Sequence, residues 1–215
     1  SLLQPKSIPT ASRAATHSKG LWVRPAPNAG QQSIMPDFIT KTDRLTLRVP
    51  TMDDVDVLTA YWGDPETMKY IGKGGEPWTR ERVEQRVAQA IERQRLSGFC
   101  FWVAQLNDTG EVIGQGGIVP VANEGPEIEL GYRLGREHWG KGYATEIARA
   151  SARYAFESIG LDRLIAVTYP ENLGSRNVLI NAGFDEVGLT DRYYEVTCML
   201  YELTRERWAS LHLHL

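Results

Sequence analysis

The sequence predicts one α+β domain built on a mixed β-sheet, and three observations support this prediction. Runs that alternate apolar and polar residues, as half-buried strands do, occur on both sides of runs with an apolar helical face. The order is strands, then a helix, then strands again, which differs from a regular strand–helix–strand series. A chain of 215 residues with 42% hydrophobic residues is also the right size for one domain with its own core.

The first half of the domain is predicted to contain a strand, two helices and a hairpin. Thr51 and Thr79 stand where the two helices should start, and a threonine hydroxyl can cap a helix N-terminus. The hairpin turn is expected at the Asn-Asp-Thr-Gly sequence 107–110. The expected ranges are a strand at 44–49, helices at 51–62 and 79–96, and strands at 99–106 and 111–121.

The second half is predicted to alternate between strands and helices. Residues 127–134 alternate as a strand, and an apolar helical face runs from Tyr143 to about residue 158. The remaining expected elements are a strand at 163–169, a short helix at 175–182, and closing strands at 184–188 and 192–203.

The first 34 residues differ in composition from the rest of the chain. They are rich in Ser, Ala, Pro and Gln, and they contain four basic residues but neither Asp nor Glu. We interpret residues 1–34 as an extension of upstream or cloning origin, placed before a domain at 35–215. Targeting to an organelle is a less favoured interpretation, because a transit peptide forms an amphipathic helix and this segment contains no convincing one.

Charge and composition narrow the class of protein. The chain has 24 basic and 27 acidic residues, so the part after residue 34 holds 20 basic residues against the same 27 acidic ones. An acidic body disfavours nucleic acid as a partner and favours a cationic acceptor. No apolar run is long enough to cross a bilayer, so we expect no membrane partner. Cys100 and Cys198 lie in apolar runs without metal-ligand spacing, which indicates buried thiols, no metal site and a cytoplasmic location.

A glycine-containing loop between the strand at 127–134 and the next helix is the most informative local feature. Gly140 and Gly142 allow a sharp turn, and the helix start after them offers N–H groups to a phosphate. The residues 135–141 nearly match a P-loop, but Gly142 stands where a metal-binding Ser or Thr is required. A dinucleotide-binding pattern fails as well, because Thr145 replaces its last glycine. An ordinary tight turn remains the alternative.

The sequence around this loop resembles the Gcn5-related N-acetyltransferases, the GNAT superfamily. The similar segments are Trp139-Gly-Lys-Gly-Tyr-Ala-Thr-Glu146, the β-rich run 163–168 and the Asn-Leu-Gly-Ser…Gly-Phe string at 172–184. Within the superfamily, the chain is most similar to the branch that modifies ribosomal protein N-termini (RimJ and RimL). The resemblance covers Thr42 to Arg207. One departure is Glu137, where the general family pattern has Gln or Arg.

This resemblance implies a fold and a cosubstrate. It implies a mostly antiparallel sheet flanked by helices, with a V-shaped splay at the acetyl-CoA site. A backbone N–H near Tyr132 or Arg133 would polarise the thioester carbonyl. No metal is implied. The residues expected to bind coenzyme A are Tyr132, Arg133, Leu134, Trp139, Gly140, Lys141, Gly142, Tyr143, Ala144, Thr145, Asn172 and Ser175.

The resemblance also suggests the groups that move protons. Glu129 is the first candidate for the general base, with Glu127 and Glu195 as alternatives; a solvent-facing strand residue is the competing interpretation. The tyrosine acid of many relatives is excluded, because Leu179 occupies its position. Ser175 takes the acid's place, although it could equally cap the short helix at 175–182.

The acceptor pocket is expected between the first two helices, where aromatic residues lie among glycines. We therefore expect transfer of an acetyl group to a primary amine in a ternary complex, by a monomer or homodimer. The alternative is a coenzyme A-binding sensor or interaction module without turnover. The acceptor itself is not identified by the sequence. The residues expected to line its pocket are Trp62, Met68, Tyr70 and Trp78.

Overall fold

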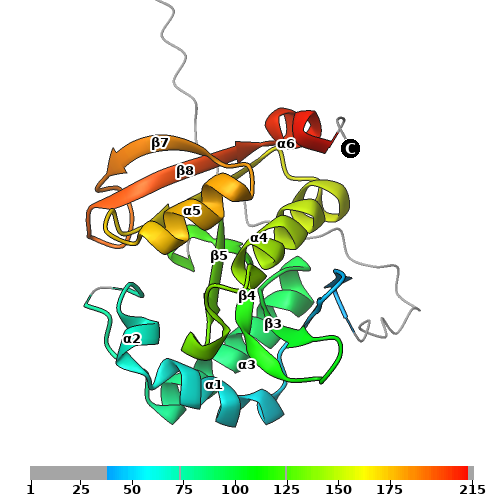
Figure 1. Cartoon of the computed structure of the whole chain (residues 1–215), viewed down its shortest axis with the longest axis vertical. Coiled ribbons are helices and arrows are strands. Elements are labelled where there is room, and N and C mark those ends of the chain that lie inside the picture. The colour runs from blue at the N-terminus through cyan, green and yellow to red at the C-terminus, as the bar shows by residue number, and fades with distance from the viewer. Residues whose placement is uncertain (1–37, 73, 124, 213–215) are drawn as a thin grey trace, which may run out of the picture.

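The computed structural model describes residues 38–72, 74–123 and 125–212 (Figure 1). The extension at residues 1–34 lies outside this range, so the boundary between extension and domain stays a prediction. Among the described residues, eight strands form one sheet in the order β1-β2-β3-β4-β5-β6-β8-β7. The strands are β1 (Thr40–Lys41), β2 (Leu45–Arg48), β3 (Phe101–Leu106), β4 (Val112–Pro120), β5 (Ile128–Leu134), β6 (Arg163–Thr168), β7 (Asp185–Thr190) and β8 (Cys198–Thr204).

Neighbouring strands run antiparallel except for β5 and β6, which are parallel. This arrangement confirms the predicted mixed, mostly antiparallel sheet. β4 and β5 pair along seven successive positions, from Gly114 opposite Leu134 to Pro120 opposite Ile128. On its other edge, β5 pairs with β6 only through Glu129 and Ile165. The two strands therefore diverge beyond Glu129, which is the expected V-shaped splay.

Helices cover both faces of this sheet. The helices are α1 (Val55–Trp62), α2 (Pro65–Met68), α3 (Arg80–Ser97), α4 (Tyr143–Arg153), α5 (Leu173–Asn181) and α6 (Arg205–His212). A short 3₁₀ helix, Met52–Asp54, leads into α1, and a π-helical turn, Tyr154–Ile159, continues α4. In Figure 1, α1 to α3 form the lower half of the molecule, and α4 to α6 lie with β7 and β8 in the upper half.

Of the three hydrophobic clusters among the described residues, two pack helices against the sheet. The larger cluster joins the sheet to α4 and α5 and includes Trp102, Ile147 and Leu179. The smaller one joins α1, α2 and α3 and contains Trp62 and Met68. The sheet therefore separates two apolar layers, one on each of its faces.

Most predicted elements are confirmed, and the exceptions have local causes. Thr79 caps α3 as expected, since its hydroxyl accepts a hydrogen bond from the Arg82 N–H. The predicted strand at 192–203 begins only at Cys198, because the chain first forms a loop in which Tyr194 and Glu195 adopt left-handed backbone angles (φ 58° and 56°). The short helices α2 and α6 were not predicted; Asp64 caps α2 by accepting a hydrogen bond from the Thr67 N–H at 2.9 Å.

Candidate active site

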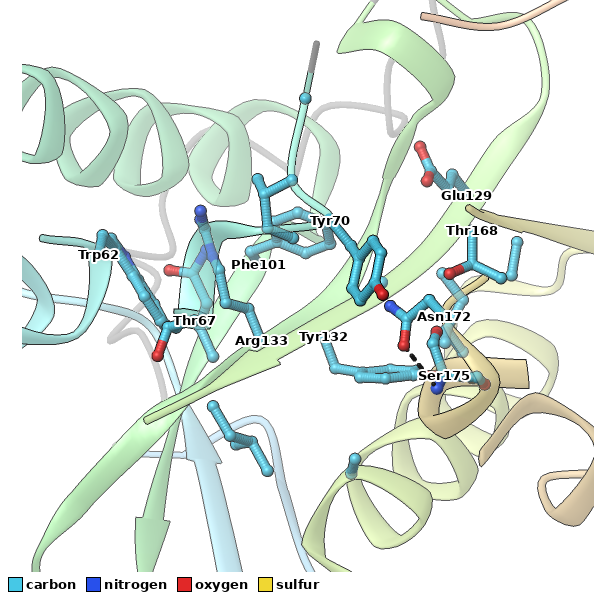
Figure 2. Close-up of a pocket in the computed structure, with 18 of the residues that line it drawn as sticks. Trp62, Thr67, Tyr70, Phe101, Glu129, Tyr132, Arg133, Thr168, Asn172 and Ser175 are labelled. Atoms are coloured by element: carbon cyan, nitrogen blue, oxygen red, sulfur yellow. Dashed lines mark hydrogen bonds between the residues drawn. The ribbon is translucent and has the colours of Figure 1, made fainter. Parts of the chain in front are cut away.

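A cavity of about 1140 Å³ lies where β5 and β6 diverge, and it is bordered by two walls. We call the wall made by α4, α5 and the loop before α4 the loop wall. The wall made by α1, α2, α3 and the chain between α2 and α3 is called the aromatic wall. Figure 2 shows residues of both walls on either side of β5. The predicted site residues that line the cavity are Trp62, Tyr70, Trp78, Glu129, Tyr132, Arg133, Leu134, Trp139, Gly140, Gly142, Tyr143, Ala144, Thr145, Asn172 and Ser175.

The loop wall has the backbone geometry that an anion requires. Gly140 and Gly142 adopt left-handed angles (φ 71° and 82°), and Gly142 precedes the first residue of α4. No atom lies within 4 Å of the position that a Cβ on Gly140 would occupy, so the loop is open on that side. Arg44 fastens the loop, because it donates to the Lys141 carbonyl at 2.9 Å and pairs with Glu146 at 2.5 Å.

Lys141 differs from the prediction in one respect. Its side chain is exposed and does not line the cavity. Only its backbone takes part in the loop, so the positive character at this point comes from N–H groups and the start of α4.

Glu129 is buried, with 8% of its surface exposed, and it lines the cavity at the base of the splay. The interpretation of Glu129 as a solvent-facing residue is therefore wrong. Desolvation raises the pKa of its carboxyl to about 7, and a short hydrogen bond from the Tyr194 hydroxyl opposes this rise. The Tyr194 hydroxyl also accepts a bond from the Ala122 N–H at 3.1 Å, so it fixes the carboxylate in place. A carboxyl group with this pKa can exchange protons near neutral pH.

The two alternative bases have different surroundings. Glu127 accepts hydrogen bonds from Arg192 at 2.9 Å and from Tyr193 at 3.2 Å, and it does not line the cavity. Glu195 lines the cavity but is exposed at its rim. Burial and position thus distinguish Glu129 from both.

Ser175 also lines the cavity, and it lies in the first turn of α5. The Tyr132 hydroxyl lies 3.0 Å from the Ser175 hydroxyl and also hydrogen-bonds to the Ser175 carbonyl at 3.1 Å. Burial raises the pKa of Tyr132. Leu179, which stands in place of a catalytic tyrosine, is buried and lines the cavity.

The interpretation of Ser175 as a helix cap is wrong. The helix begins at Leu173, and the Asn172 side-chain oxygen caps it by accepting a hydrogen bond from the Ser175 N–H at 3.1 Å (Figure 2, dashed). The Ser175 hydroxyl is consequently not needed for capping. The Asn172 side-chain nitrogen can still donate a hydrogen bond to a ligand.

The aromatic wall contains three of the four expected residues. Tyr70 packs near Tyr169, whose hydroxyl donates to the Gly72 carbonyl at 2.8 Å and ties the chain after α2 to the chain after β6. Trp62 and Trp78 enclose the guanidinium of Arg133. Met68, predicted to line the pocket, is fully buried in the smaller core and does not line the cavity.

The residues of the site that were not predicted include Tyr194 beside Glu129, Phe101 in β3 and Thr168 at the end of β6, all of which line the cavity. Phe101 shapes its floor, since a Cβ on Gly131 would approach the Phe101 ring to 2.9 Å. No local pattern marks these positions, because each reaches the cavity from a different strand or loop.

The buried thiols predicted from the composition are confirmed in the described residues. Cys100 and Cys198 are both buried and free. In the described residues, no group of His, Cys, Asp or Glu side chains could hold a metal ion. None of the helices in that range is long and apolar enough to cross a membrane.

Comparison with known proteins agrees with this geometry. Residues 44–185 match the acetyltransferase (GNAT) domain model. An uncharacterized N-acetyltransferase of Bacillus licheniformis, p20, is 38% identical over 175 residues, which cover 79% of this chain and 97% of p20. Among solved structures, an acetyltransferase from Agrobacterium tumefaciens superposes with a TM-score of 0.66 at 30% identity, covering 77% of this chain and 94% of its own.

The fold is also shared with Mycobacterium smegmatis RimJ in complex with CoA-disulfide, at a TM-score of 0.65 and 24% identity over 79% of this chain and 88% of that protein. With a family model matching most of the domain and a relative at 38% identity, the chain belongs to the GNAT family of acetyltransferases.

Proposed function

We propose that this acetyltransferase moves the acetyl group of acetyl-CoA directly to a primary amine, with both substrates bound in the splay. The observation that carries the proposal is Glu129, a buried carboxyl with a pKa of about 7 at the base of the splay. An amine attacks only as the free base, and a carboxylate with this pKa accepts its proton near neutral pH. Acetyl-CoA supplies the activated thioester.

The loop wall fits the cosubstrate. The N–H groups around Gly140 and Gly142 suit a pyrophosphate, because the turn is open and leads into a helix N-terminus. Among the described residues, the edge of β5 that faces β6 has no strand partner beyond Glu129, so its backbone can pair with the amides of the pantetheine arm. A β5 N–H near Tyr132 or Arg133 would then stabilise the developing oxyanion.

Glu129 and Ser175 suit opposite proton transfers. Glu129 takes the proton that the amine loses, and Ser175 returns a proton to the departing sulfur. The Tyr132 hydroxyl, 3.0 Å from the Ser175 hydroxyl, orients it and can replenish its proton. Asn172 donates a hydrogen bond from its amide nitrogen to the pantetheine arm, while its side-chain oxygen caps α5.

The test is release of free thiol from acetyl-CoA in the presence of a panel of amines: N-terminal peptides, polyamines, amino acids and aminoglycosides. We expect at least one class to raise thiol release well above hydrolysis, with one acetyl group appearing on the amine per thiol. If no class does so while calorimetry shows coenzyme A binding, the protein is a coenzyme A-binding module instead.

A further inference from the structure

Arg133 is a buried cation on the aromatic wall. Only 9% of its surface is exposed, and its guanidinium carbon lies 4.1 Å from the ring centre of Trp62 and 4.2 Å from that of Trp78. Its Nη1 also lies 3.4 Å from the Met68 sulfur. In the described part of the chain, no carboxylate lies within ion-pair distance of it. Burying a charge without an opposite charge is costly, and stacking on aromatic rings recovers only part of that cost.

Two further arginines gather at the same place. Arg82 and Arg86, from successive turns of α3, have guanidinium carbons 4.6 Å and 5.5 Å from the Trp78 ring centre. Arg86 donates to Gln89 at 3.3 Å, and neither arginine has a carboxylate partner among the residues described. Burial, together with the smaller effect of the Arg86 and Arg82 charges, lowers the pKa of Arg133 to about 9. Arg133 is therefore still cationic at neutral pH, and the neighbouring guanidinium groups of Arg82 and Arg86 repel it.

The three arginines line the acceptor side of the cavity. Successive residues of a strand point to opposite faces, so Arg133 faces α1 and α3, whereas Tyr132 faces α5. The cluster thus lies across β5 from the phosphate-binding loop before α4. Figure 2 shows Arg133 beside Trp62 at one end of the strand and Glu129 toward the other.

Glu129, Gly131 and Arg133 share one face of β5, which gives that face opposite charges at its two ends. Four residues of strand separate the Cα atoms of Glu129 and Arg133 by about 13 Å. Gly131 and the Phe101 ring lie between them and keep the middle apolar. The carboxylates of Glu171 and Glu195 line the cavity as well, together with Glu66, which lies beyond ion-pair distance of the three arginines.

We propose that the acceptor is an amine that also carries an oxyanion, and that Arg133, Arg82 and Arg86 bind this group while Glu129 receives the amine. This assignment rests on the proposed acetyl transfer. Guanidinium groups bind carboxylates and phosphates through paired hydrogen bonds, and the anion would remove the repulsion among the three cations. The acidic net charge of the domain by itself favours a cationic acceptor. The arginine cluster refines this expectation to an acceptor with charges of both signs. The span of the strand favours an anion several bonds from the amine, as in an ω-amino acid or a short peptide.

The first experiment compares acceptors that differ only in the anion. Thiol release is measured with glycine, 4-aminobutyrate, 6-aminohexanoate and diglycine, each against its carboxamide. An aminoalkyl phosphate series distinguishes phosphate from carboxylate as the preferred oxyanion. We expect kcat/KM to be about 10–100-fold higher for the oxyanion member of the best pair, as for a charged hydrogen bond.

The second experiment removes the cations. In Arg133→Gln, the ratio of kcat/KM for acid over amide should fall toward one, mainly through KM. Because Arg133 also packs between two tryptophans, the double variant Arg82→Gln/Arg86→Gln, on a more exposed helix face, tests the same ratio if the first variant does not fold. Arg95→Gln is the matched control, since Arg95 lies on the same helix, pairs with Glu92 and does not line the cavity.

Binding measured without turnover separates this inference from the proposed function. Calorimetric titration of each acid and its amide into the protein saturated with coenzyme A reports oxyanion recognition even if no acetyl group is transferred. Tighter binding of the acid by the wild type, lost in the arginine variants and kept in Arg95→Gln, supports the inference. Equal binding and equal turnover of acid and amide would overturn it, and acetyl transfer would stand unaffected.

Discussion

The loop wall and the aromatic wall of the cavity offer different physical means of binding a ligand. On the loop wall, residues close together in sequence present backbone N–H groups, and Gly140 and Gly142 keep side chains away from the ligand. On the aromatic wall, side chains from α1, α3 and β5 meet, and Arg133 is held between Trp62 and Trp78.

This difference explains what each wall can specify. A backbone surface recognises phosphate and amide groups in any protein that shares the turn, so it suits a cosubstrate common to the family. A side-chain surface changes with single substitutions, so it suits the acceptor, which differs between enzymes. The walls should therefore respond differently to mutation.

Gly142→Asp should have the largest effect, because it adds a carboxylate and a strained side chain (φ 82° in the wild type) where the pyrophosphate approaches. We expect calorimetry to detect no coenzyme A binding. Gly160→Asp is the matched control, since Gly160 has nearly the same backbone angle (φ 84°) but does not line the cavity. Undiminished affinity in folded Gly142→Asp would place the phosphate site elsewhere.

Glu129→Gln should lower kcat/KM by about 10²–10⁴-fold if the carboxylate acts as the base. The wild-type carboxylate is ionised only above its pKa of about 7, so its advantage should be largest just above neutral pH. The rate of the wild type should rise with pH near pH 7, and this limb of the pH–rate profile should be absent in the variant. Glu127→Gln, whose parent side chain is paired with Arg192, should keep that limb; an identical effect in both variants would contradict the assignment.

Ser175→Ala should lower kcat by about 10²-fold, with coenzyme A affinity retained, because the neighbouring Tyr132 hydroxyl can supply part of the lost acid function. Tyr132→Phe should lower it less, and the double variant more than either. A thioester with a more acidic leaving thiol should rescue Ser175→Ala more than the wild type. Equal gains for both proteins would show that Ser175 gives no proton to sulfur.

The pKa of Glu129 also predicts how stability depends on pH. The folded carboxyl has a pKa of about 7, above the ordinary value of 4.5, so the folded state binds more protons than the unfolded state between these values. Ionisation of Glu129 therefore destabilises the fold as the pH rises from 4.5 to 7, by roughly 1–3 kcal/mol. Relative to the wild type, Glu129→Gln should gain in free energy of unfolding over this interval. If the free energy of unfolding of Glu129→Gln differed from that of the wild type by the same amount at pH 4 and at pH 8, the raised pKa would be contradicted.

Asn172→Ala should have the smallest effect, a loss of about 0.5–2 kcal/mol in the free energy of unfolding, because it removes the cap of α5. Asn172→Asp retains the capping oxygen and removes the nitrogen that would donate to pantetheine. Its stability should stay near that of the wild type while the KM for acetyl-CoA rises. An unchanged KM would limit Asn172 to capping.

Local features could be predicted from the sequence because their causes are local. The left-handed turn at Gly140 and Gly142 needs residues without a Cβ, and the start of α3 needs a capping residue such as Thr79. The alternation along 128–134 likewise defines which residues of β5 share a face. The family resemblance rests on the same short segments.

Only the tertiary structure decided the properties that depend on contacts between distant segments. Glu129 has its raised pKa because β6 and the Tyr194 loop fold over it and exclude water. Met68 is buried, although its neighbours line the cavity, because α2 turns it toward the small core. Arg133 follows Tyr132 in sequence, but it belongs to the aromatic wall because adjacent residues of a strand face opposite sides of the sheet. Burial and charge pairing are set by residues far apart in the chain, so no local pattern contains them.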